Sequence, residues 1–138
     1  MRGSKLYITL GVSVITIIVV GILMFSGNEA VKAEQAGDIG NLINNTLADA
    51  NSIMTEISDD PDLTKNKPYL ATQLELVIVN QQEYKRLEKV KWKDETKKKL
   101  TRSILVNSEK VLQGYLKGNS NQKETLDLLR EEYNTLIE

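Results

Sequence analysis

An uncharged run of twenty residues near the N-terminus limits what this chain can fold into more than any other feature. The run extends from Leu6 to Phe25 and reads LYITLGVSVITIIVVGILMF. As a helix rising about 1.5 Å per residue, it would span about 30 Å, the thickness of the hydrocarbon core of a bilayer. Its polar side chains are hydroxyls, which membrane helices accommodate by bonding back to their own backbone. The run therefore predicts a transmembrane helix over residues 6–25.

The charges on either side of this run indicate its orientation. Arg2 and Lys5 precede it, in a short basic flank over residues 1–5, whereas the charges that follow are mostly acidic. Positive charges are retained on the cytoplasmic side of a membrane segment. We therefore expect a single-pass membrane protein with its N-terminus in the cytoplasm and its C-terminal domain outside, held in the lipid bilayer by residues 6–25.

A cleaved signal peptide is the alternative interpretation of the same run. Val31 and Ala33 have side chains that a signal peptidase accepts, and cleavage after Ala33 would release a secreted protein that begins at Glu34. The apolar run is longer than the roughly 7–15 residues of a signal-peptide core, which favours a retained anchor. The secreted form stays open as an alternative.

The chain contains no Cys and no His, and this absence excludes several classes of function. Without Cys there is no disulfide framework, thiol nucleophile or thiolate metal site. Without His, hydrolysis by a Ser-His-Asp triad or by a His-bound zinc ion lacks its usual residues. We expect no catalytic residue, cofactor or metal site, and a helical small-ligand sensor or an enzyme remains only as an alternative.

An all-α fold is predicted for the remainder of the chain. Hydrophobic residues make up 41% of the sequence but aromatic residues only 5%, so the core has to be aliphatic, as in helix bundles. Residues 26–38 are rich in Gly, Ala and Glu, and they suit a stalk. From Ile39, apolar residues recur at spacings of three and four, the period of an amphipathic helix. The bundle domain is thus expected over residues 39–138.

The expected helices are separated by recognisable stop and start signals. Pro61 ends the first helix, and Pro68 suits the first position of the second. Asp94 is a candidate N-cap after a turn near residues 91–95, and Gly118 is a candidate stop for the third helix. The predicted apolar faces consist of Ile39, Ile43, Thr46, Leu47, Ala50, Ile53, Met54 and Ile57; Leu70, Leu74, Val77, Ile78, Gln81, Tyr84 and Leu87; Leu100, Ile104, Val111 and Tyr115; and Leu126, Leu129, Tyr133, Leu136 and Ile137.

The fourth helix is predicted to begin with a capping box formed by Asn121 and Glu124. Four helices with short connections favour an up-down-up-down antiparallel bundle. Residues 68–113 contain neither Gly nor an internal Pro after Pro68, so three helices with one long middle helix are the alternative.

Charge is distributed unevenly along this domain. Residues 28–64 hold one basic and eight acidic residues, whereas residues 65–117 hold thirteen basic and six acidic residues. If the first helix leaves the membrane, the second returns toward it, so the following turn lies near the lipid. We therefore predict contact of this turn with anionic lipid headgroups or another polyanion, with Trp92 in the interface. The candidate contact residues are Lys89, Lys91, Trp92, Lys93, Lys97, Lys98, Lys99 and Arg102.

A structural interpretation of the same cluster stands beside this one. The basic side chains would be solvated, or paired on the bundle surface with acids of the first and last helices, where each exposed pair contributes little. The candidate acids are Glu29, Glu34, Asp38, Glu131, Glu132 and Glu138. Nucleic acid is not expected as a partner, because the domain is exported and Trp92 is the only aromatic residue within the cluster.

Together these features predict a membrane-anchored, non-enzymatic helical binding module outside the cytoplasm. Its expected partner is another cell-envelope protein or surface. The sequence does not identify that partner.

Overall fold

The computed structural model describes residues 28–138, so the predicted transmembrane run over residues 6–25 lies outside the described residues. The chain divides into two units, Met1–Gly37 and Asp38–Glu138, and the second holds the helical domain. None of the helices that the structure describes is both long enough and apolar enough to cross a membrane.

Four α-helices and one short 3-10 helix make up the described residues, which contain no strand. They are α2 (Asn28–Asp59), η1 (Pro61–Lys65), α3 (Lys67–Leu87), α4 (Glu95–Leu116) and α5 (Lys123–Ile137). The all-α prediction is confirmed. The chain leaves helical geometry between Leu87 and Glu95, so α3 and α4 are separate helices and the arrangement with one long middle helix is wrong.

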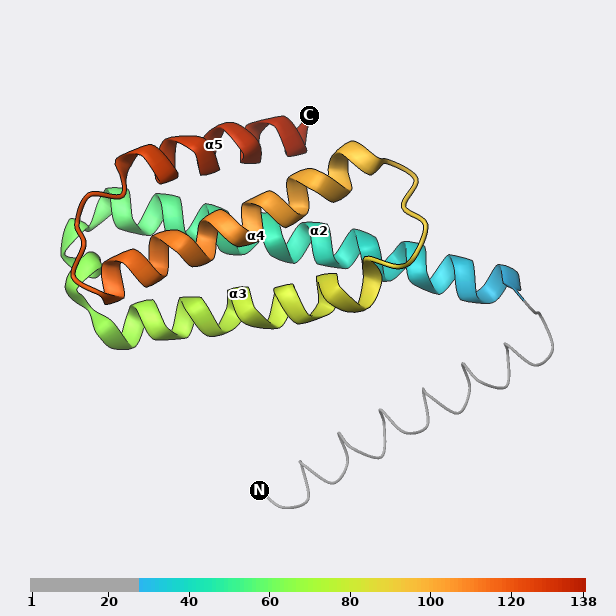
Figure 1. The fold of residues 1–138 in the computed structure, drawn as a ribbon, viewed down its shortest axis with the longest axis horizontal. Helices are drawn as coiled ribbons and strands as arrows, with labels where there is room; N and C mark the ends of the chain where they lie inside the picture. The colour runs from blue at the N-terminus through green and yellow to red at the C-terminus, as the bar shows by residue number, and fades with distance from the viewer. Residues whose placement is uncertain (1–27) are drawn as a thin grey trace, which may run out of the picture. The chain divides into compact units, whose positions relative to one another are not determined.

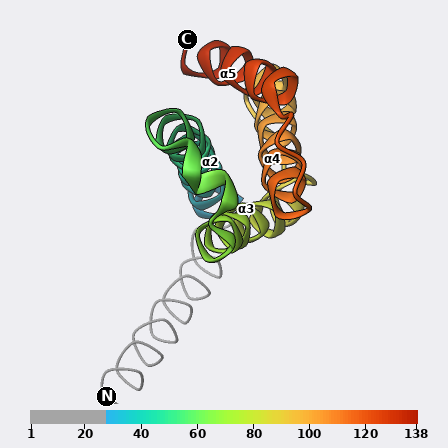
Figure 2. The ribbon, with the colours of Figure 1, turned by 90° about the vertical axis from the view of Figure 1, so that its left-hand side faces the viewer.

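Successive helices of the domain run in opposite directions, as expected for an up-down-up-down bundle (Figure 1). Viewed along the helices, α2, α3, α4 and α5 follow one another around a shared interior (Figure 2). The turn between α3 and α4 lies at one end of this bundle, and η1 and the connection from α4 to α5 lie at the other (Figure 1). α2 begins at Asn28, so most of the segment expected as a stalk is already helical.

Local signals place the helix ends close to where the sequence predicts them. α2 ends at Asp59, two residues before Pro61. α3 begins one residue earlier than predicted, because Asn66 is its N-cap and accepts a hydrogen bond from the Tyr69 backbone N–H at 3.1 Å. Pro68 therefore occupies the second helical position, where its missing N–H also costs nothing.

The connection between α4 and α5 differs from its prediction. Gly118 ends α4 as expected, with a φ of 84° that favours glycine. The capping box of Asn121 and Glu124 is wrong, because Gln122 is the N-cap and makes no capping bond through its side chain. Its amide donates instead to the Asn119 carbonyl oxygen at 3.1 Å, and the side chain is 6% exposed. Tertiary packing has thus replaced the local cap.

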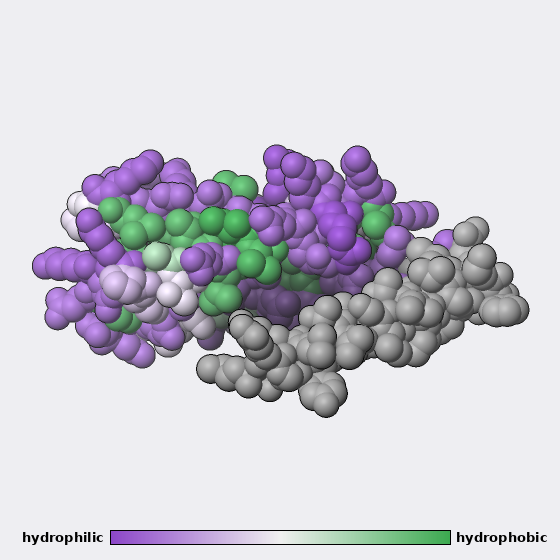
Figure 3. All heavy atoms as spheres, turned by 90° about the horizontal axis from the view of Figure 1, so that it is seen from below, coloured by the Kyte–Doolittle hydropathy of each residue, from purple (hydrophilic) through white to green (hydrophobic). Residues whose placement is uncertain are grey.

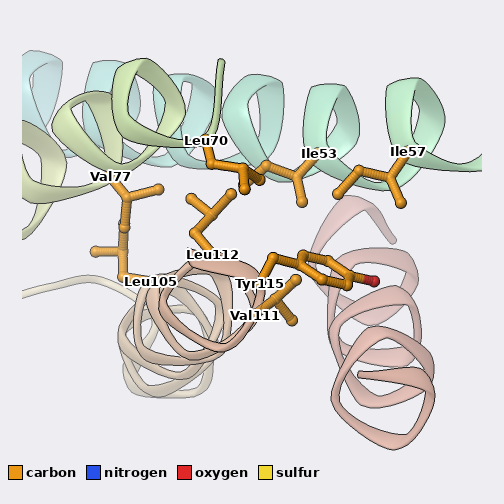
Figure 4. Close-up of a cluster of buried hydrophobic side chains, with 8 residues drawn as sticks. All are labelled: Ile53, Ile57, Leu70, Val77, Leu105, Val111, Leu112 and Tyr115. Atoms are coloured by element: carbon orange, nitrogen blue, oxygen red, sulfur yellow. The ribbon is translucent and has the colours of Figure 1, made fainter. Parts of the chain in front are cut away.

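The core is aliphatic and fills the space enclosed by the helices. One cluster joins α2, α3 and α4, with its side chains directed toward one another (Figure 4). Its members are Ile53, Ile57, Leu70, Val77, Leu105, Val111, Leu112 and Tyr115. A second cluster packs Leu129 and Leu136 of α5 against α2 and α4. Most predicted core positions are confirmed, whereas Ile78 is 37% exposed and was assigned wrongly to a buried face. Of the neighbours Leu136 and Ile137, which were alternatives for one position, Leu136 is the buried residue.

Hydrogen bonds between amides and carboxylates connect each helix to the next around the bundle. The Asn80 amide donates to Asp49 at 2.6 Å, between α3 and α2. The Gln81 amide donates to Glu109 at 2.7 Å, between α3 and α4, and the Asn107 amide donates to Glu132, between α4 and α5. Partly buried polar pairs of this kind disfavour other helix registers, because a shifted register would leave them without partners.

Candidate anionic-surface site

The turn between α3 and α4 carries the densest positive charge of the described chain. Residues 85–102 hold nine basic and three acidic residues. Eight of the nine basic residues are exposed, and we call the seven of these that form no described ion pair the basic end. The basic end consists of Lys85, Lys89, Lys91, Lys93, Lys97, Lys99 and Arg102.

Trp92 lies in the core, contrary to the prediction that its indole would reach a lipid surface. The side chain is only 3% exposed and packs with Leu42 and Leu87. Its ring lies 6.0 Å from the ring of Tyr84, centroid to centroid. The indole N–H donates to the Leu87 carbonyl oxygen at 3.0 Å, beside the bond that this oxygen accepts from the Val90 backbone N–H at 3.1 Å. Burial of a large apolar ring with its polar atom paired is worth more than exposure, so Trp92 anchors the turn from within.

Two further contacts hold the turn in one conformation. The Asp94 carboxylate accepts a hydrogen bond from the Lys97 backbone N–H at 3.1 Å, so the predicted N-cap of α4 is confirmed. Lys98 is half-buried and its ammonium donates to the Glu88 carbonyl oxygen at 2.6 Å, across the turn. Lys98 therefore has a structural partner, whereas its neighbours Lys97 and Lys99 extend into solvent.

The basic end has no carboxylate partners among the side chains that the structure describes. Arg86, which is adjacent in sequence, binds Asp38 at 2.7 Å and Glu83 as well. The hydrogen bond from Arg86 holds the pKa of Glu83 below its usual value. The remaining described ion pairs join Asp127 to Lys123 and Arg130 in α5. Intramolecular pairing therefore accounts for Arg86 and not for the basic end.

The acids expected to neutralise the cluster have other positions. Asp38 is bound to Arg86, and Glu132 accepts from Asn107. Glu131 and Glu138 are exposed and form no described ion pair, and neither does Glu34. The basic end is thus solvated and forms no described pair with these acids, while the Glu29 side chain lies outside the described residues.

The position of Lys97 and Lys99 opposes the dipole of α4. Lys97 lies in the first turn of this helix, where the unsatisfied N–H groups create a partial positive charge, and Lys99 follows in the second turn, where this charge is weaker. Cations in the first turn lower helix stability, whereas Glu95 in the same turn raises it. The helix dipole therefore disfavours Lys97, and disfavours Lys99 to a smaller extent.

The basic end is close to the point where the chain enters the domain. Asp38, the first residue of this unit, is bound to Arg86 in the last turn of α3. The antiparallel course of α2 and α3 brings the start of the domain and the α3–α4 turn to the same end (Figure 1).

Two open grooves and an apolar band are the other features of the described surface. The groove between α2 and α3 has a volume of about 550 Å³ and contains Asp38, Asn41, Val79 and Arg86 in its lining. A smaller groove, of about 330 Å³, lies between α2 and α5. An apolar band runs along the face on the α3 side, between hydrophilic side chains (Figure 3). The exposed large apolar residues of α3 are Leu76, Ile78 and Val79, of which Val79, at 60%, is the most exposed.

These features provide no recognisable catalytic arrangement in residues 28–138. In the groove between α2 and α3, the carboxylates of Asp38 and Glu83 are both bound to Arg86 and are not free to act as bases. No three acidic side chains of the described chain are close enough together to hold a metal ion.

Three of the contacts at this site were missed by the sequence reasoning. These are the bond from Lys98 to Glu88, the bond from Trp92 to Leu87 and the pair of Arg86 with Asp38. Only the last had a sequence signal, namely opposite charges on two helices expected to be neighbours.

Comparison with known proteins gives no relative from which roles could be transferred. No family model, no curated protein and no solved structure matches this chain. We therefore infer roles for the residues of this chain only from their charges and their contacts in the structure.

Proposed function

We propose that this chain is a single-pass membrane protein whose helical bundle acts outside the cytoplasm as a non-enzymatic binding module. The observation that carries the proposal is the uncharged run of twenty residues from Leu6 to Phe25. Such a run is more stable in lipid than in water, and Arg2 and Lys5 favour retention of its leading end in the cytoplasm.

The absence of Cys and His supports a binding role rather than catalysis. The hydrogen bonds between helices also favour one rigid arrangement of the bundle, which suits a module that presents a surface. The proposed partners are another cell-envelope protein or an envelope surface, and the basic end is the candidate contact.

The retained anchor is favoured over the secreted form. The uncharged run of twenty residues exceeds the roughly 7–15 residues of a signal-peptide core.

Membrane extraction combined with intact mass tests the proposal. The full chain is expressed in cells, membranes are washed with alkaline carbonate, and the mass of the retained protein is measured. We expect full-length protein in the membrane pellet. A soluble product that begins at Glu34 would instead establish the secreted form.

Orientation is tested on intact spheroplasts with an external protease. We expect loss of the C-terminal domain and survival of a fragment that contains residues 1–25. Protection of the whole chain until the membrane is permeabilised would place the domain in the cytoplasm and contradict the proposal.

A further inference from the structure

We propose that the basic end docks on anionic lipid headgroups of the same bilayer that holds the chain. This inference rests on the proposed membrane anchoring and adds the chemical class of the ligand. Four features carry it: unpaired charge, fixed presentation, an unfavourable position of Lys97 in α4, and the short stretch of sequence between the proposed anchor and the domain.

The unpaired charge is the first of these. Seven exposed cationic side chains surround one turn, and none has a described carboxylate partner. Clusters of four to eight Lys and Arg residues beside a membrane helix bind anionic headgroups at the cytoplasmic face, and the same attraction acts at any leaflet that carries anionic lipid. Each such residue near the surface contributes about fivefold to binding.

The fold presents these charges in one arrangement. Because Trp92 is buried, its neighbours Lys91 and Lys93 extend outward on either side of it. The bond from Lys98 to the Glu88 carbonyl oxygen connects the start of α4 to the end of α3. The turn is thus ordered before it meets a ligand, which lowers the entropic cost of binding.

An anionic partner would offset the unfavourable electrostatic energy that Lys97 and Lys99 have in the isolated domain. They repel the positive end of the α4 dipole, and a layer of phosphate groups would relieve that repulsion. An anionic surface beneath the turn therefore stabilises both the contact and the helix.

The chain before the domain limits how far the basic end can move from the membrane. Residues 26–37 span at most about 42 Å even when fully extended, at about 3.5 Å per residue. Tethering at such short range raises the effective concentration into the millimolar range, so weak contacts become populated.

The chemistry of the basic end fits lipid better than it fits a protein partner. Protein interfaces are anchored by exposed aromatic residues and Arg, and they are depleted in Lys. Here the aromatic side chain of the turn is buried, and six of the seven exposed cations are lysines. Flexible ammonium groups without a fixed pocket suit a diffuse layer of phosphate charge.

Lysine acetylation of the full-length protein in vesicles tests the inference. The chain is reconstituted in vesicles of phosphatidylcholine alone or mixed with phosphatidylglycerol, and an impermeant acetylating reagent is added. We expect Lys91, Lys93 and Lys99 to react about fivefold more slowly with the anionic lipid. Lys65, Lys67 and Lys117, which are exposed at the other end of the bundle, should react at equal rates in both.

Repeating the acetylation at high salt provides a second test, because the Debye length falls from about 10 Å at 0.1 M to about 3 Å at 1 M. The protection should disappear at the higher salt concentration. Equal acetylation in both lipids, in a chain that resists carbonate extraction, would overturn the docking but leave the anchor intact. Release of the chain by carbonate would overturn the anchor and the docking with it.

Matched triple variants separate the basic end from overall charge. The variant Lys91→Gln/Lys93→Gln/Lys99→Gln should abolish the protection of the remaining Lys85 and Lys89. The variant Lys65→Gln/Lys67→Gln/Lys117→Gln loses the same charge and should retain it. If a soluble anionic polysaccharide protects the basic end and anionic lipid does not, the ligand is a polyanion and the lipid assignment is wrong.

Discussion

Trp92 connects the core of the bundle to its charged end. The residue occupies a turn of high positive charge, and yet its ring is enclosed by Leu42, Leu87 and Tyr84. Its indole N–H also donates a hydrogen bond to the Leu87 carbonyl oxygen at the end of α3. A single buried side chain therefore determines both the path of the turn and the outward direction of the lysines next to it.

Replacing Trp92 by Ala should destabilise the protein by about 3–5 kcal/mol, since it removes a large buried ring and leaves a cavity. Urea unfolding of the full chain in detergent, followed by circular dichroism, measures this loss. Val79→Ala, at a site that is 60% exposed, should change stability by less than about 0.5 kcal/mol. Similar small effects for both variants would show that the indole is not buried.

Quenching by lipid provides an independent check on Trp92, which is the only Trp in the chain. Because the ring is enclosed, brominated acyl chains should leave its fluorescence unchanged when the chain is reconstituted in anionic vesicles. Strong quenching would mean that the turn opens and inserts its indole into the bilayer.

Asp49 is expected to make stability depend on pH. Burial raises the pKa of this carboxyl group, and the hydrogen bond from Asn80 opposes the shift. The folded protein thus holds the proton more tightly than the unfolded chain does. Ionised Asp49 costs stability above the folded pKa, and the cost disappears below the ordinary value of 3.8.

The variant Asp49→Asn removes that cost while an amide oxygen remains to accept from Asn80. Its stability advantage over the native protein should therefore grow as pH rises from below 4 through the raised pKa. Urea midpoints of both proteins across this range measure the difference. An advantage that does not vary with pH would contradict the assignment.

Each helix of the domain combines local signals with contacts that no local signal encodes. α4 begins after the N-cap Asp94 and ends before Gly118, as the sequence signals predict. Gly114, inside α4, is different, because a Cβ atom there would clash with the side-chain amide of Gln122. This glycine lets the buried side chain of Gln122 pack against α4, and so it sets the approach of α5.

Gly114→Ala should destabilise the protein by about 1–3 kcal/mol, although Ala is the better helix former. The cause is displacement of Gln122 from its buried position. Thermal unfolding of Gly114→Ala, Gln122→Ala and the double variant forms a double-mutant cycle. The double variant should be more stable than the sum of the single effects predicts, and simple additivity would exclude the clash as the cause.

Across the described residues, positive charge is most concentrated at the end that carries the α3–α4 turn. The polar pairs between helices and the three apolar clusters hold the bundle together, and the basic end contributes repulsion. The ligand proposed for the basic end would relieve this repulsion, which no described internal partner does.

Lys97→Gln/Lys99→Gln should therefore stabilise the protein, by a few tenths of a kcal/mol for each lysine removed from the positive end of α4. The urea midpoint in detergent at low salt measures this gain, which should shrink as salt is added. Lys85→Gln, in the last turn of α3, is the opposite control, because a cation there favours the helix dipole. A loss of stability in the first variant would mean that these lysines have partners within the fold.

The sequence by itself determined the class of fold and most of its divisions. The aliphatic period, Pro61, Asp94 and Gly118 act within a few residues of themselves, so their effects do not depend on the rest of the chain. The concentration of basic residues in one segment was equally visible, because the charge of a side chain is set by its residue type and its position is given by the sequence.

Only the tertiary structure decided which side chains are free to act. Trp92 and Gln122 are buried because of neighbours distant in sequence, and Ile78 is exposed because no helix covers its side of α3. The same applies to charge: Arg86 is neutralised by Asp38, 48 residues away, whereas Lys91 and Lys93 are not. Burial and ion pairing depend on contacts with residues from all parts of the fold, and a local sequence pattern contains only the contacts between near neighbours.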